Sequence, residues 1–91
     1  MKASLKSGYF VQEIAGEKIL MGGGTDVDFS KMMVLNGTSA WIVELLQEQP
    51  LTEEDVARKL TERFEVDYGQ ALADVQSLFR RLLELGVVAE E

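Results

Sequence analysis

The chain of 91 residues contains no cysteine and no histidine. Without cysteine it can form no disulfide, and without either residue it lacks the ligands of the common zinc sites and the usual pairs of nucleophile and base. These absences argue against a metalloenzyme and are typical of a cytoplasmic protein. We therefore expect neither a metal site nor a cofactor.

Long hydrophobic runs and positive charge are also scarce. No segment approaches the roughly 20 apolar residues of a membrane span, and residues 1–8 have no apolar core like that of a signal peptide, so we expect them to be loosely ordered. Nine lysines and arginines stand against sixteen aspartates and glutamates, which gives a formal net charge of −7. This balance opposes contact with phosphate backbones or anionic lipid, so we expect no nucleic acid and no membrane as partners.

The remaining composition is that of an ordinary globular domain, with 46% hydrophobic and 27% charged residues, and a chain of this length is expected to form one domain.

The first half of the chain predicts strands. Two apolar runs, Tyr9–Ile14 and Glu17–Met21, flank Ala15 and Gly16, and a two-residue connection with glycine is typical of a hairpin. A third run, Met32–Leu35, completes a predicted three-stranded antiparallel sheet.

The second half predicts three helices that begin near Asn36, Thr52 and Asp67. Each of these side chains can accept a hydrogen bond from the free amides of a first helical turn, and Thr52 with Asp55 forms a capping box. The first helix ends before Pro50, because the residue before a proline is pushed out of the helical region. The predicted fold class is therefore α+β, a small three-stranded antiparallel sheet followed by three helices, in the manner of a winged helix-turn-helix.

The first helix is apolar from Ala40 to Leu46 at every position but Glu44, which predicts a buried central helix. Gly86 is a candidate C-cap for the third helix, and residues 87–89 form a candidate short strand after it. The side chains expected to be substantially buried are Trp41, Leu45, Leu60 and Phe79.

The apolar positions of the third helix span roughly 160°, wider than the stripe of about 100° that a helix lying on a core needs. These positions are Ala71, Leu72, Val75, Leu78, Phe79, Leu82 and Leu83. The surplus is either core packed against two neighbours, which the pattern favours, or the wall of an exposed groove. Both alternatives stay open at this point.

Two loop motifs fail on inspection, and we read Gly22–Lys31 as a flexible loop with Phe29 tucked inward. The glycines at its start resemble a dinucleotide-binding loop, but Val27 replaces the third motif glycine and no helix follows. The spacing of Asp26, Asp28 and Ser30 imitates the start of a calcium loop without its turn glycine or its final glutamate.

One longer stretch resembles a known family. Residues 35–46, Leu-Asn-Gly-Thr-Ser-Ala-Trp-Ile-Val-Glu-Leu-Leu, are similar to the Leu-Asn-x-Thr-Gly-Ala-aromatic-Ile-Trp-x-Leu-Leu segment of PqqD-like proteins. Ser39 stands where glycine is usual and Val43 where tryptophan is common. The later order of parts also matches, with Thr52–Val56, Phe64–Asp67 and the closing Leu85–Val88, so the likeness covers nearly the whole chain from Tyr9.

The resemblance implies a single peptide-recognition domain over residues 1–91 with no catalytic residues. Such domains bind the leader segment of a ribosomally made precursor peptide by β-strand addition and present it to a modifying enzyme, often of the radical SAM type. The expected partners are therefore this peptide and this enzyme, and the chain is expected to be a monomer or weak dimer. The implied peptide-binding residues are Met32, Met33, Val34, Val75, Leu78, Phe79, Arg81 and Leu82.

The alternative function is a winged-helix transcriptional regulator or another protein-interaction module. In a regulator the third helix would read DNA. Its polar side offers only Arg80 and Arg81 as cations, a poor match to the clustered positive charge that phosphate contacts require.

Overall fold

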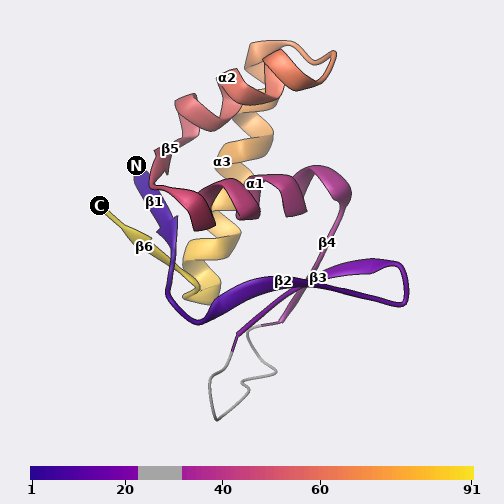
Figure 1. Cartoon of the computed structure of the whole chain (residues 1–91). Coiled ribbons are helices and arrows are strands. Elements are labelled where there is room, and N and C mark those ends of the chain that lie inside the picture. Colours follow the sequence, from indigo (N-terminus) through magenta and orange to yellow (C-terminus); the bar gives the residue numbers. More distant parts are fainter. Residues whose placement is uncertain (23–31) are drawn as a thin grey trace.

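A computed structural model describes residues 1–22 and 32–91 of the chain. Within these residues the fold is α+β, with two small antiparallel sheets and three helices (Figure 1). The elements in chain order are β1 (Lys2–Leu5), β2 (Tyr9–Ile14), β3 (Glu17–Gly22), β4 (Met33–Leu35), α1 (Gly37–Glu48), β5 (Leu51–Thr52), α2 (Glu53–Arg63), α3 (Tyr68–Leu85) and β6 (Val88–Glu90). The expected loop with Phe29 falls at 23–31, outside the described residues.

The sheet predicted over Tyr9–Leu35 is confirmed, with strand order β2-β3-β4. β2 and β3 form a hairpin in which Ile14 faces Glu17. The two turn residues have positive φ, 53° at Ala15 and 83° at Gly16, the left-handed backbone that matches the twist of a tight hairpin. β4 pairs with β3 through Ile19 and Val34 and leads directly into α1.

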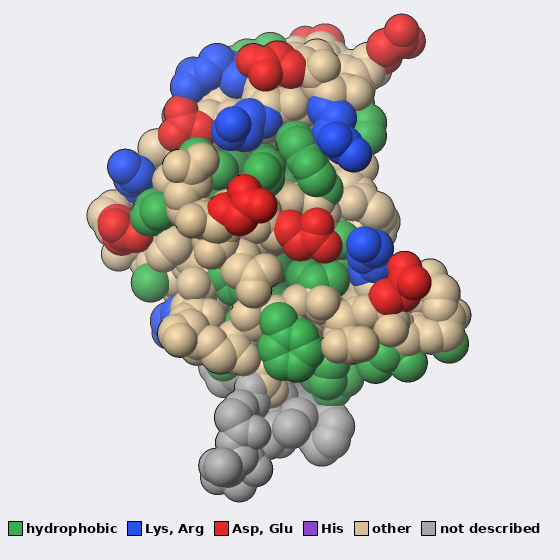
Figure 2. All heavy atoms as spheres, viewed as in Figure 1, with side chains coloured by type: hydrophobic (Ala, Val, Ile, Leu, Met, Phe, Trp, Pro, Cys, Tyr) green, Lys and Arg blue, Asp and Glu red, His purple; other side chains and the backbone are tan. Residues whose placement is uncertain are grey.

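The two faces of this sheet have different surroundings. The inner face packs on α1 and carries the buried side chains of Leu20 and Leu35. The outer face leaves Phe10, Ile14 and Val34 exposed, with Val34 at 61%. Figure 2 shows hydrophobic side chains gathered along this lower side of the hairpin.

The expectation that residues 1–8 are loosely ordered is wrong for Lys2–Leu5. This segment is β1, the middle strand of a second sheet with order β5-β1-β6, and Ala3 is fully buried. The small side chain of Ala3 gives no hydrophobic signal, and both partner strands lie far along the sequence. The short strand expected at 87–89 is present as β6, one residue later.

The helix ends follow the predicted capping chemistry. The Asn36 side chain accepts from the Ser39 amide at 2.7 Å, and Asp67 accepts from the amides of Gly69 and Gln70. The capping box of Thr52 is complete, because its hydroxyl and the Asp55 carboxylate each accept from the other residue's backbone N–H. Gly86 ends α3 with φ at 81°, as expected for a glycine C-cap.

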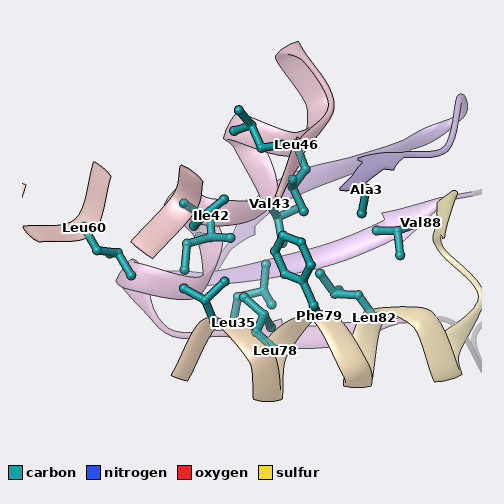
Figure 3. Close-up of a cluster of buried hydrophobic side chains, with 14 of the residues drawn as sticks. Ala3, Leu35, Ile42, Val43, Leu46, Leu60, Leu78, Phe79, Leu82 and Val88 are labelled. Atoms are coloured by element: carbon teal, nitrogen blue, oxygen red, sulfur yellow. The ribbon is translucent and has the colours of Figure 1, made fainter. Parts of the chain in front are cut away.

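The core lies between α1, α3 and the inner faces of the two sheets (Figure 3). In Figure 3 Phe79 points from α3 toward Val43 of α1. Leu60 and Phe79 are buried as predicted, whereas Trp41 and Leu45 are only partly buried and pack against the core from its rim. The prediction of a buried central helix therefore holds for one side of α1, because its other side remains at the surface.

The wide apolar arc of α3 is core against two neighbours, the alternative that the sequence favoured. α3 packs along α2 and also directs Phe79 toward α1. Among the seven apolar residues that define this arc, Leu83 is the exposed one, at 41%. A helix that serves two neighbours needs a stripe wider than the one that a single core face requires.

Candidate functional site

β4 is an edge strand within the described part of the chain. Its one side pairs with β3, and the strand order of the sheet ends at β4. An edge strand presents backbone N–H and C=O groups that a further strand can satisfy. β4 therefore offers a short site for backbone pairing. Met32, Met33 and Val34, which the family resemblance implied as peptide-binding residues, lie in this strand or directly before it.

A cleft of about 320 Å³ separates β4 from the end of α3. We call it the strand cleft, and its lining residues are Met32, Met33, Arg81, Glu84 and Leu85. Three of the residues that the family resemblance implied, Met32, Met33 and Arg81, therefore lie together in this cleft. Val34 lies on the opposite, outer face of the sheet.

The other helix residues predicted for the site lie elsewhere. Val75, Phe79 and Leu82 have at most 1% of their surface exposed and belong to the core. A side chain buried between α3 and its neighbours is not available to a partner in this arrangement. Leu78, at 5% exposure, reaches the edge of a second cleft.

This second cleft, of about 490 Å³, lies where the start of α1, the end of α2 and the middle of α3 meet. We call it the helix cleft, and its lining residues are Asn36, Thr38, Ser39, Ile42, Leu60, Phe64, Val66, Ala71, Asp74, Ser77, Leu78 and Arg81. Arg81 lines both clefts, so the two adjoin at this residue. Sequence reasoning missed the helix cleft, because its lining residues come together only when the three helices pack.

The charges around the clefts are few. Arg81 forms no ion pair with any described residue, and Asp74 accepts a hydrogen bond from the Gln70 side chain at 2.9 Å. Glu84 is the acidic residue of the strand cleft. Arg81 is thus the cation that an acidic group entering either cleft would meet.

An aromatic cluster borders the helix cleft. The rings of Trp41 and Phe64 meet edge to face with centroids 5.8 Å apart. The Arg63 guanidinium lies 5.2 Å from the Trp41 ring centroid and 5.6 Å from that of Phe64. These contacts hold Phe64 in place although 40% of it is exposed, and they link the single tryptophan of the chain to the cleft wall.

Neither a cluster of metal ligands nor a membrane-spanning helix is present in the described residues. No group of three or more aspartates, glutamates, histidines or cysteines there is placed to hold a metal ion. No helix in residues 1–22 and 32–91 has the length and hydrophobicity needed to span a bilayer.

Comparison with protein families gives a match over most of the chain. The family model described as coenzyme PQQ synthesis protein D (PqqD) matches residues 17–88. This range runs from β3 to the start of β6 and so contains β4, α3 and both clefts. No curated protein and no solved structure matches the chain.

Proposed function

The chain belongs to the PqqD family, and on this basis we propose that it is a non-catalytic accessory protein that binds the leader segment of a ribosomally synthesised precursor peptide. The peptide adds as a strand to β4, and the protein presents it in the cytoplasm to a modifying enzyme, for example one of the radical SAM type. The protein acts as a monomer or weak dimer.

The observation that carries this proposal is the edge of β4 beside the strand cleft. A peptide strand paired with β4 would place alternate side chains toward α3, where Met32 and Met33 line the cleft. Methionine is flexible and polarizable, so it can repack around different apolar side chains. Backbone pairing would supply affinity, and the cleft would select among sequences.

Arg81 gives the docked peptide an electrostatic preference. It is exposed and has no carboxylate partner among the described residues. An acidic peptide residue beside it would gain about 0.2 to 1 kcal/mol, the range of exposed ion pairs. We accordingly expect leader segments with an aspartate or glutamate to bind best.

The test is a titration of the isotope-labelled protein with peptides encoded by short genes beside its own. We expect chemical-shift changes in β4 and on the Arg81 side of α3. Changes confined to α2, with β4 unaffected, would rule out docking by strand addition.

Proline substitutions can separate docking from folding. Consecutive amides of a strand point to opposite edges, so one of Met33→Pro and Val34→Pro removes a bond to β3 and the other removes a donor from the free edge. We expect one variant to lose stability and the other to keep its fold but lose the peptide. Val34→Thr is the control, because it keeps the amide and should bind normally. A free-edge proline variant with unchanged affinity would contradict the proposal.

A further inference from the structure

We propose that the helix cleft binds one large apolar side chain of the docked peptide, such as leucine or phenylalanine, from a residue beyond the segment paired with β4. This inference rests on the proposed function and adds a second recognition element to it. In the peptide that we propose, an acidic residue lies between the segment that pairs with β4 and the large apolar residue.

The position of the cleft along β4 is the first argument. Asn36 directly follows the last residue of β4 and lines the helix cleft, together with Thr38 and Ser39 of the first turn of α1. A chain that runs beside β4 and continues past Leu35 is therefore directed into this cleft. Because Arg81 lines both clefts, the same chain meets the guanidinium on the way.

The chemistry of the walls is the second argument. Four of the side chains lining the cleft are apolar and at most 5% exposed, namely Ile42, Leu60, Ala71 and Leu78. Phe64 stands at its side with 40% of its surface in water. A large apolar side chain that enters would cover Phe64, and burial of such a side chain raises affinity by about tenfold or more.

The rim selects for a peptide over a purely apolar molecule. Thr38, Ser39 and Ser77, which carry hydroxyl groups and are less buried than the apolar lining residues Ile42, Leu60, Ala71 and Leu78, also line the cleft. Polar groups of this kind can satisfy the backbone of an entering chain. The Asn36 side chain is already used, since it accepts from the Ser39 amide in the helix cap.

Trp41 provides a signal for occupancy of the cleft. It is the single tryptophan of the chain, and its ring touches Phe64 edge to face. A side chain packed on Phe64 changes the surroundings of this aromatic pair. Tryptophan emission should therefore shift when a peptide fills the helix cleft.

The experiment selects binders from a library of short randomised peptides on the wild-type protein. Selected peptides are then measured against Ser77→Phe, which places a ring in the cleft, and against Gln76→Phe. Gln76 is the matched control, because it is the exposed neighbour on α3 and lines a different cleft. Circular dichroism checks whether both variants keep the helix content of the wild type.

We expect the selected peptides to share one large apolar residue with an acidic residue nearby. Their affinity should fall about tenfold for Ser77→Phe and stay unchanged for Gln76→Phe. Alanine at the apolar peptide residue should weaken binding to the wild type but cause little further loss with Ser77→Phe, because both changes remove the same contact. Binding to the wild type should also shift the Trp41 emission.

Two results would overturn the inference in distinguishable ways. Peptides that lose affinity for the free-edge proline variant but bind Ser77→Phe and Gln76→Phe equally well would refute the helix cleft and leave strand addition intact. A library from which no peptide binds the wild-type protein would count against the proposed function as well.

Discussion

Two adjacent leucines of α1 offer a direct test of how the core is built. Leu46 is 1% exposed and belongs to the buried cluster, whereas Leu45 packs on the rim of that cluster and stays partly exposed. We expect Leu46→Ala to lower the free energy of unfolding by about 2 to 5 kcal/mol, the range for buried leucines. Leu45→Ala should lower it by about 1 kcal/mol, because less apolar surface returns to water.

The comparison of Leu45→Ala with Leu46→Ala separates the effect of burial from the effect of alanine on helix propensity. Both residues lie in the last turn of the same helix, so the gain in helix propensity from alanine is small and nearly equal. A domain of this length has a total stability of about 5 to 14 kcal/mol, so the loss at Leu46 is a large share of it. The melting temperature should fall by at least about 8 °C for Leu46→Ala. For Leu45→Ala it should fall by about 4 to 8 °C.

The assay is urea unfolding followed by circular dichroism of the helices. Trp41 fluorescence is less suitable, because Trp41 lies one helical turn before Leu45. The denaturant slope should stay constant, so that the midpoint reports stability alone. Equal losses for the two variants would refute the distinction between core and rim on α1.

Three further predictions concern charge and close packing. The backbone N–H of Thr52, the hydroxyl of the same residue and then Arg58 lower the pKa of Asp55 below its ordinary value of 3.8. A carboxylate whose pKa is lowered by folding stabilises the folded state at pH values above its ordinary pKa, and this stabilisation is lost as the pH falls through the pKa of the folded state. The urea midpoints of wild type and Asp55→Asn should therefore converge below about pH 4. Gly22→Ala should destabilise the protein in thermal unfolding, because a Cβ there would overlap the ring of Tyr9; a melting temperature equal to that of wild type would contradict this contact. Fluorescence anisotropy should detect no specific duplex binding at physiological salt, given the net charge of −7, and a submicromolar, salt-dependent complex would favour a DNA-binding regulator instead.

Features fixed by neighbouring residues could be predicted from the sequence. The caps at Asn36, Thr52, Asp67 and Gly86 depend on hydrogen bonds and backbone angles within a few residues, and the structure has all four. The hairpin at Gly16 is local in the same sense. The strand at Lys2–Leu5 was missed because its partners lie about 50 and 85 positions away.

The surface of the helices could be predicted less well. An apolar pattern predicts that a side chain is buried, but the number of helices and strands packed around it decides how much of its surface is buried. Trp41 is apolar like Val43, yet Val43 is fully buried opposite Phe79 of α3, while Trp41 packs at the rim of the core beside Phe64 and Arg63. The juxtaposition of Met32 with Arg81 followed from the family resemblance, and the helix cleft did not, because it forms only when α1, α2 and α3 are packed together.

The position of β1 also has a kinetic consequence. Ala3 pairs with Leu51 on one side and Glu90 on the other, so this sheet joins segments from nearly the full length of the chain, and Figure 1 shows the two ends side by side. Closing such long loops costs conformational entropy before any contact compensates for it. The hairpin and helices close only short loops, so the β5-β1-β6 sheet should form late in folding, and its amides should be among the first to exchange with solvent when the molecule opens locally.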